Sequence, residues 1–223
     1  MRAPISVVIP TLNAAASLSD TLEALVEGLD AGLVTELIVS DGGSTDDTTM
    51  LAEAWGANVI EGAASRGGQL RRGCAAARAP WLLILHADTR LAPGWTEAAR
   101  AHLQINEAGY FRLRFDPGGR WVAAWANRRA QWFGLPYGDQ GLLVSRALYD
   151  SVGGYPNISL MEDVALARAL KGHLFALAFT AHTGAERYQR GGWTLHGSRN
   201  LLMLPRYPSG ADPEKLAKAY RRR

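Results

Sequence analysis

The run Trp81-Leu82-Leu83-Ile84-Leu85 is followed directly by His86-Ala87-Asp88-Thr89. An uninterrupted apolar run of this length is typical of a strand that is buried on both faces, as in a parallel sheet. In open α/β sheets, ligands bind beyond the carboxyl ends of the strands. Asp88 is therefore a candidate ligand of a metal ion or a substrate, and capping of the next helix or turn is the alternative that these residues leave open.

Strand and helix signals alternate through the first half of the chain. The expected strands are 5–9, 37–39, 58–60 and 81–85. A helix capped by Ser17 is expected from the helical spacing of Leu18, Leu22, Leu25 and Leu29, and further helices are expected from Thr45 or Asp46 and from about Gln69 to Arg78. This alternation predicts an α/β fold with a mostly parallel central sheet flanked by helices.

The second half of the chain is less regular. Phe111, Leu113 and Phe115 alternate with arginines, which predicts a half-exposed strand. Further strands are expected at 141–145 and 174–179, and helices at 121–133, near Glu162, at 193–204 and from 213 to the end. Three tryptophans of the 121–133 helix fall on roughly one face, and we expect that face to pack into the core, with a ligand platform as the alternative.

Composition restricts the class of protein. The chain has 223 residues, of which 48% are hydrophobic and 20% are charged, as expected for one compact domain with a short appendage at most. A net charge of +3 allows anionic ligands without requiring nucleic acid. Cys74 is the only cysteine, so no intrachain disulfide is possible and a reducing compartment is expected. The absence of a signal-like or membrane-spanning apolar segment predicts a cytoplasmic protein.

Polar turns follow the first two strands. Pro10-Thr11-Leu12-Asn13 leaves the first strand, and Ser40-Asp41-Gly42-Gly43-Ser44-Thr45-Asp46 leaves the second. Short polar side chains and free amides at these points can hold a nucleobase or a ribose, and Asp41 can accept hydrogen bonds from either. An ordinary glycine turn followed by a helix cap is the alternative for the second segment.

Two further segments contain side chains suited to binding ions, the first an anion and the second a cation. In Ser65-Arg66-Gly67-Gly68-Gln69, an arginine lies beside glycines at a helix start, which suits a diphosphate, although a solvated arginine is equally consistent. A hard divalent cation would take an oxygen of Asp88 and bridge to diphosphate oxygens. His86 would either ligate that cation or orient the loop, and we favour the orienting role.

Acidic and amide side chains gather at two later points. Tyr137-Gly138-Asp139-Gln140-Gly141 precedes a strand, so Asp139 and Gln140 are candidates for contact with the sugar or the acceptor. Met161-Glu162-Asp163-Val164 begins a helix, where acidic residues commonly complement the helix dipole. A carboxylate at this position is also a candidate general base for an acceptor hydroxyl.

Together these segments resemble glycosyltransferase family 2. The matching elements are Val7 to Asn13, Ser40 to Asp46, His86-Ala87-Asp88 and Glu162-Asp163, in this order and with this spacing. Arg66 to Gln69, His86 to Leu91, Tyr137 to Leu142 and Met161 to Val164 are similar to a small bacterial subgroup associated with radical-SAM and selenoprotein-like domains. The resemblance extends to about residue 205. It implies the A-type fold, in which a Rossmann-like nucleotide half and an acceptor half share one sheet.

The resemblance also implies residue roles. Asp41 would contact the nucleotide, Asp88 would hold the metal and the diphosphate, and Asp163 would be the base, with Glu162 next in line. The implied donor-binding residues are Pro10, Thr11, Asn13, Asp41, Gly42, Arg66, Gly67, Ala87, Asp88 and Arg187, and the implied metal ligands are Asp88 and His86.

Three positions depart from the family pattern. His86 occupies the first position of the usual Asp-X-Asp motif, and Asn13 replaces the usual glutamate after the first strand. The Gln-X-X-Arg-Trp element is absent in strict form. Arg187 is similar to its counterpart, with Arg190 as the alternative.

The predicted function is an inverting glycosyltransferase that uses a nucleotide-diphospho-sugar, with a UDP-sugar as the best guess, and Mn²⁺ or Mg²⁺. One domain is expected over 1–205, with nucleotide-binding half 1–90 and acceptor half 91–205, followed by a basic tail helix at 206–223. A solvated tail and a tail that touches an acidic membrane surface are both open. A non-catalytic sugar-nucleotide-binding module and a sugar-nucleotidyltransferase are the alternatives, although the latter's glycine-rich basic loop is missing after the first strand. The Gly-X-Gly-X-X-Gly turn of dinucleotide dehydrogenases is also missing there.

Overall fold

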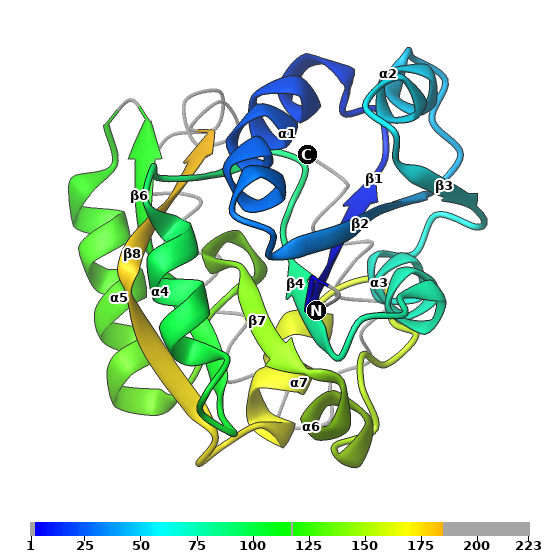
Figure 1. Ribbon diagram of the computed structural model, residues 1–223. Helices are drawn as coiled ribbons and strands as arrows, with labels where there is room; N and C mark the ends of the chain where they lie inside the picture. Colours follow the sequence, from blue (N-terminus) through cyan, green and yellow to red (C-terminus); the bar gives the residue numbers. More distant parts are fainter. Residues whose placement is uncertain (1–2, 117, 185–223) are drawn as a thin grey trace.

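One eight-stranded sheet forms the centre of the protein, and helices cover both of its faces (Figure 1). The computed structural model describes residues 3–116 and 118–184. The strands are β1 (Ile5–Thr11), β2 (Val34–Asp41), β3 (Asn58–Glu61), β4 (Trp81–Ile84), β5 (Thr89–Leu91), β6 (Ala108–Asp116), β7 (Leu142–Ser145) and β8 (Leu174–Gly184). The helices are α1 (Ala15–Asp30), α2 (Thr48–Ala54), α3 (Arg66–Ala76), α4 (Trp95–His102), α5 (Arg120–Phe133), α6 (Arg146–Ser151) and α7 (Glu162–Ala169), with a 3-10 turn, η1, at Gly138–Gln140.

The strand order is β3-β2-β1-β4-β7-β6-β8-β5. β1 runs parallel to β2 and β4, β2 to β3, and β6 to β8, whereas β7 is antiparallel to both β4 and β6. The predicted α/β fold with a mixed, mostly parallel sheet is therefore confirmed. These directions bring the ends of β1, β2, β4 and β8 to the same edge as the start of β7, and this edge carries the polar residues singled out above.

Alternate residues of the central strands pack against different helices. Ile5, Val7 and Ile9 of β1 belong to one apolar cluster with α1 and α4, whereas Val8 lies in a second cluster with α3 and α7. All residues of β1 are buried, as are Leu82 to Ile84 of β4. Burial on both faces makes these strands a rigid base for the residues that follow them.

The first helix does not start at Ser17. It begins at Ala15, and Ser17 lies within its first turn. Asp46 Oδ2 accepts a hydrogen bond from the backbone amide of Ala15 at 3.1 Å, and Thr48 Oγ1 accepts one from Ala14 at 2.8 Å. Side chains from the turn after β2 therefore satisfy the first amides of α1, and a local cap is unnecessary.

The third helix begins earlier than expected. It starts at Arg66 instead of near Gln69, and the side chain of Ser65 accepts a hydrogen bond from Gly68 at its N-terminus. Gly67 is packed so closely that a Cβ at this position would lie 2.2 Å from the backbone oxygen of Pro156. This contact joins the start of α3 to the segment that leads into α7.

The expectation that the tryptophans of α5 pack into the core is wrong. Trp121 is 88% exposed and Trp132 is 65% exposed. The helix instead buries small residues, Ala123, Ala126 and Ala130, because its axis lies close to β6.

The expected helices at 193–204 and from 213 onward lie outside the described residues, as does the tail at 206–223. None of the helices in the described ranges combines the length and the apolar character needed to cross a bilayer.

Candidate active site

An open cavity of about 490 Å³ lies at the carboxyl edge of the sheet. Its wall includes residues that the sequence singled out from segments far apart in the chain: Pro10, Thr11, Asn13, Arg66, His86, Ala87, Asp88, Asp139, Glu162 and Asp163. Residues at the strand ends line it together with residues of η1 and of the first turn of α7. The fold therefore collects both candidate groups, donor-binding and catalytic, around one space.

Asp41 lies beside this cavity and is 1% exposed. Its carboxylate accepts hydrogen bonds from Thr11 Oγ1, from the amides of Gly43 and Ser44, and from Ser44 Oγ, at 2.6–2.8 Å. Burial opposes ionisation of Asp41, but these hydrogen bonds outweigh it and lower the pKa. Asp41 is therefore an ionised anchor of the turn, and its contact with a nucleotide stays a prediction.

Gln69 is a structural residue whose role the sequence did not indicate. Its Nε2 donates to the backbone oxygens of Thr11 at 2.6 Å and Ser40 at 3.1 Å, so it ties together the ends of β1 and β2. Its amide also packs 3.0 Å from the position that a Cβ on Gly42 would occupy. Gly42 and Gly67 are thus required by close packing and do not line the cavity, and their predicted donor contacts stay predictions.

Arg66 connects three elements across the cavity. Its Nε lies 3.2 Å from Glu162 Oε1, and its Nη2 lies 2.8 and 2.7 Å from the two ring nitrogens of His86. Burial disfavours the charge of Arg66, but Glu162 first, then Asp163 and Asp88, raise its pKa above the ordinary value. A charged guanidinium thus lines the cavity in a fixed position, as a diphosphate-binding group requires.

The placement of His86 favours its orienting role. A guanidinium beside the imidazole nitrogens competes with a metal ion for their lone pairs. The ring also lies against Gly138, where a Cβ would be 2.1 Å from His86 Nε2. His86, which follows β4, therefore fixes the position of η1 relative to the end of that strand through the contact of its ring with Gly138.

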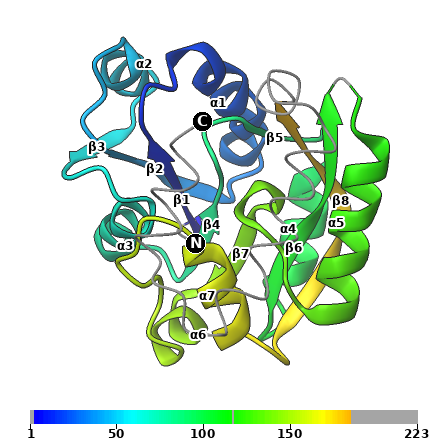
Figure 2. The same cartoon turned by 180° about the vertical axis from the view of Figure 1, so that it is seen from behind.

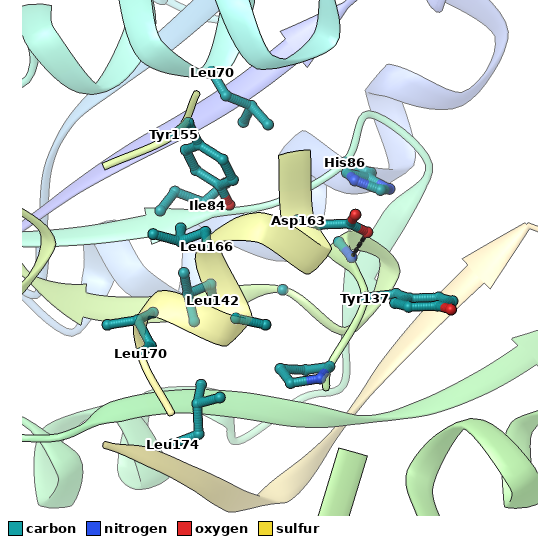
Figure 3. Close-up of a pocket in the computed structure, with 14 residues that line it drawn as sticks. Leu70, Ile84, His86, Tyr137, Leu142, Tyr155, Asp163, Leu166, Leu170 and Leu174 are labelled. Carbon is teal, nitrogen blue, oxygen red and sulfur yellow. Dashed lines mark hydrogen bonds between the residues drawn. The ribbon is translucent and has the colours of Figure 1, made fainter. Parts of the chain in front are cut away.

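Asp163 is held at the start of α7. Its Oδ2 accepts a hydrogen bond from the amide of Gly138 at 2.9 Å, and its Oδ1 accepts one from Val164 at 2.7 Å. Figure 3 shows this carboxylate above an apolar groove walled by Leu142, Leu166 and Leu170. The free space in the groove is about 20 Å³, room for about one water molecule. Asp163 therefore lies above tightly packed apolar side chains and also lines the open cavity.

Glu162 differs from its neighbour by being 1% exposed, with Oε2 lacking a hydrogen-bond partner in the described chain. Burial, together with the negative charge of Asp163, raises the pKa of Glu162 to about 7, although Arg66 opposes the shift. Its other carboxylate oxygen, Oε1, forms the ion pair with Arg66. This geometry suits a residue that positions Arg66.

Asp139 and Gln140 have different surroundings. Asp139 lines the cavity, and its buried Oδ1 has no partner among the described residues. Gln140 is fully buried, and its amide bonds to the backbone oxygen of Phe111 at 3.2 Å and to Asn127 Oδ1 at 3.3 Å. Gln140 therefore holds η1 against β6 and α5, and its placement gives no support to the predicted sugar contact.

Arg129 of α5 is a charged site neighbour that sequence reasoning missed. It is 5% exposed, its guanidinium carbon lies 3.3 Å from the centre of the Tyr137 ring, and its Nε donates to Leu135 O at 3.1 Å. Its charge also lowers the pKa of Asp139 against the larger effect of burial. No sequence signal marks it, because an arginine in a polar helix is normally solvated.

Backbone strain also concentrates at the cavity. Asn13 and Met161 have φ angles of 50° and 69°, and within the described ranges they are the two non-glycine residues with positive φ. Asparagine tolerates this conformation, but methionine does so rarely. Both residues line the cavity, and strain retained at such positions is typical of functional sites.

The residues present fit a hard divalent cation only in part. Asp88 and Asp139 present carboxylates to the cavity, and in the described chain no group of three or more His, Cys, Asp or Glu side chains could hold a metal alone. Magnesium-type ions often bind one or two carboxylates and complete their coordination with substrate phosphates and water. The set therefore fits a cation held jointly with a bound diphosphate.

The sequence profile described as Glycosyl transferase family 2 matches residues 6–154. The chain belongs to this family. The predicted family is thereby confirmed, whereas the radical-SAM-associated subgroup stays a prediction. Arg187 and Arg190 lie outside the described residues, so this family member's counterpart of the Gln-X-X-Arg-Trp element also stays a prediction.

Curated relatives of this family 2 member match short stretches. Glucosyl-3-phosphoglycerate synthase of Mycobacterium tuberculosis is 50% identical over 56 residues, which are 25% of this chain and 17% of that protein. A PGL/p-HBAD biosynthesis glycosyltransferase of Mycobacterium bovis is 36% identical over 99 residues, 41% of this chain and 38% of that protein. The matches thus span well under half of these relatives.

Solved structures match over most of this chain. The M. tuberculosis synthase in complex with Mn²⁺, UDP and glucosyl-3-phosphoglycerate superposes with a TM-score of 0.56 at 25% identity, covering 81% of this chain and 70% of that one. S. aureus TarS in complex with UDP-GlcNAc has a TM-score of 0.63 at 15% identity, covering 81% and 58%. The second likeness concerns the fold alone.

We predict that Gly138→Ala destabilises the protein through His86. The new methyl group would overlap His86 Nε2, and in a packed site such overlap costs about 1–3 kcal/mol. Removing the ring in a His86→Ala background should relieve this cost. Urea unfolding of both single variants and the double variant measures the coupling. Strictly additive effects would contradict the contact.

The cavity also predicts a pH dependence of stability. Burial raises the pKa of Asp139 from 3.8 to about 6, so the folded state holds the proton more tightly than the unfolded chain. The free energy of unfolding contributed by this group is therefore present at low pH and is lost as the pH rises through about 6. Glu162 acts in the same direction up to about pH 7.

Urea unfolding at several pH values between 4 and 7 tests this pH dependence. Asp139→Asn should lose less stability over this interval than the wild type does. Asp20→Asn, on the exposed side of α1, is the matched control and should follow the wild type. Parallel curves for wild type and Asp139→Asn would show that Asp139 titrates normally.

Proposed function

We propose that the chain is an inverting glycosyltransferase that moves a sugar from a nucleotide-diphospho-sugar to an acceptor hydroxyl. One observation carries the proposal. The carboxylates of Asp88 and Asp163 line one cavity, the first at the end of a buried strand and the second at the start of α7. A metal-side carboxylate and a base-side carboxylate across a cavity are what a single displacement at a sugar carbon needs.

The donor is proposed to lie along the ends of β1, β2 and β4. Thr11 and Asn13 line this part of the cavity, next to the ionised Asp41 turn. Arg66 faces the same space with its charge held by Glu162, which supports a diphosphate there. UDP is the proposed nucleotide, because the solved M. tuberculosis synthase, a structural neighbour at 25% identity, was crystallised with it.

A divalent cation, Mn²⁺ or Mg²⁺, is proposed to bind Asp88, with Asp139 as a further carboxylate of the same cavity wall. Such an ion offsets negative charge on a departing diphosphate. Arg66 supplies positive charge to the same leaving group, and Arg187 is proposed to help. His86 is proposed to hold Arg66 and η1 in place and not to ligate the ion, since its ring nitrogens face the guanidinium.

The proposed chemical step needs no protein nucleophile. The acceptor oxygen forms a bond to the anomeric carbon while the bond from that carbon to the diphosphate oxygen breaks. Asp163 takes the acceptor proton, and the nucleoside diphosphate leaves with the bonding electrons. Attack from the face opposite the leaving group inverts the configuration. Glu162 is proposed to keep Arg66 in position, and it is the next candidate for the base.

The acceptor remains the least specified partner. Asp139 lines the cavity, and its Oδ1 has no hydrogen-bond partner among the described residues, which supports a hydrogen bond to a sugar or acceptor hydroxyl. Contact of the basic tail at 206–223 with an acidic membrane surface stays a prediction, as does a cytoplasmic location.

Asp163→Asn should lower the rate of sugar transfer by about 10²–10⁴-fold, because the amide cannot accept the acceptor proton. Donor affinity should be retained, since the amide keeps the shape of the carboxylate. Release of UDP from UDP-glucose, measured with and without a panel of hydroxyl acceptors, follows the reaction. Asp150→Asn, on the exposed face of α6, is the control.

Wild-type rates in Asp163→Asn would rule out this base and transfer the role to Glu162. A wild-type protein that binds UDP-glucose but never releases UDP with any acceptor would support the binding-module alternative instead.

Asp88→Asn should remove the metal-dependent part of donor binding. Donor that binds only the folded state raises the unfolding temperature by mass action. Wild-type protein should show a larger thermal shift with UDP-glucose and Mn²⁺ than with UDP-glucose alone, and Asp88→Asn should show equal shifts. An unchanged response to Mn²⁺ in Asp88→Asn would exclude Asp88 as the ligand.

A further inference from the structure

Helix α5 exposes an unusual number of large aromatic side chains. Trp121 is 88% exposed, Trp125 39%, Trp132 65% and Phe133 57%. We call these four residues the aromatic face of α5. Isolated exposed apolar residues are common on soluble proteins, but several large ones gathered on a single helix are typical of an interaction surface.

The orientation of the helix is fixed by its opposite side. Asn127 Oδ1 accepts a hydrogen bond from the amide of Leu113 at 2.8 Å, and its Nδ2 donates to the oxygen of Leu113 at 3.0 Å. Ala123 and Ala126 pack with Leu113 and Phe115 of β6. Rotation that would bury the tryptophans would break both hydrogen bonds and insert indole rings where only methyl groups fit. These contacts on the opposite side of α5 therefore keep the aromatic face turned away from β6.

The charged side chains of α5 are all positive. Its 14 residues include three arginines and no acidic residue. Arg120 and Arg128 are exposed, and the spacing of residues 121, 125, 128 and 132 puts Arg128 on the same stripe as three tryptophans. Aromatic rings and a guanidinium thus share one stripe of the α5 surface.

The position of the aromatic face relates it to the cavity. Figures 1 and 2 both show α5 at the outer side of the β6 and β8 end of the sheet, away from α2 and α3. The helix ends at Phe133, a few residues before η1, and Arg129 joins it to Leu135 and Tyr137. A surface bound by α5 would therefore lie beside the acceptor side of the cavity.

We propose that the aromatic face of α5 docks onto the headgroup layer of an anionic lipid bilayer. Tryptophan prefers the bilayer interface, where its ring is in an apolar layer and its N–H is near water. Arg128 on the same stripe and the exposed Arg120 at the start of the helix are attracted to anionic headgroups. An anionic layer therefore complements the exposed aromatic and cationic side chains of α5, a helix without an acidic residue. The inference goes beyond the proposed function and does not depend on it.

Vesicle co-sedimentation of the full chain tests the proposal. The probes are vesicles of phosphatidylcholine alone and vesicles with roughly one-third phosphatidylglycerol. Wild-type protein should sediment with the anionic vesicles. The double variant Trp121→Ser/Trp132→Ser should bind them at least about tenfold more weakly. Trp55→Ser, which removes a 41% exposed tryptophan at the end of α2, should bind like the wild type.

Several results would overturn the proposal. One is a wild-type protein that does not sediment with the anionic vesicles. Another is a double variant that binds them as the wild type does, because the basic tail would then account for binding. Sedimentation velocity supplies the third, namely a wild-type dimer that becomes monomeric in the double variant, which would make a second copy the occupant. Equal urea unfolding of the double variant and the wild type confirms that a loss of binding is not a loss of fold.

Discussion

The ion pair between Arg66 and Glu162 joins the two walls of the cavity. Arg66 comes from the start of α3, and Glu162 comes from the start of α7, nearly a hundred residues later. Glu162 is buried whereas the Arg66 side chain is 35% exposed, so loss of Arg66 would leave a buried carboxylate without its partner, which is destabilising. The pair therefore fixes α7, and with it Asp163, relative to the strand ends. It also fixes a guanidinium where a diphosphate is proposed to lie.

A second chain of contacts runs through the end of β4. The apolar strand carries His86 to the cavity, His86 packs against Gly138, and the amide of Gly138 donates to Asp163. Gly138 is necessary because no side chain fits between the ring and the turn. The strained Met161 then turns the chain into α7. Asp163, the proposed base, is thus positioned by contacts that originate at the sheet, and it still lines the cavity.

Most of the sheet and half of the site follow from local sequence patterns. Five consecutive apolar residues before Asp88 predicted a buried strand with a polar residue at its carboxyl end, and parallel strands must present such residues at one edge. Local patterns failed where the deciding partner lies in another element or in a loop outside the helix. The start of α1 is capped by Asp46 and Thr48, the tryptophans of α5 are turned outward by Asn127, and Arg129 is buried by stacking on Tyr137.

By itself, the sequence determined the strand pattern, the polar turns at the strand ends and the family, because these depend on the order and spacing of residues along the chain. Only the tertiary structure decided which polar side chains already have partners within the fold and which are available to a ligand. Asp41 is saturated by hydrogen bonds within its turn, Gln140 is enclosed, and Glu162 is paired with Arg66. Burial and hydrogen bonding set the charge and availability of a side chain, and both arise from neighbours that the fold alone brings together.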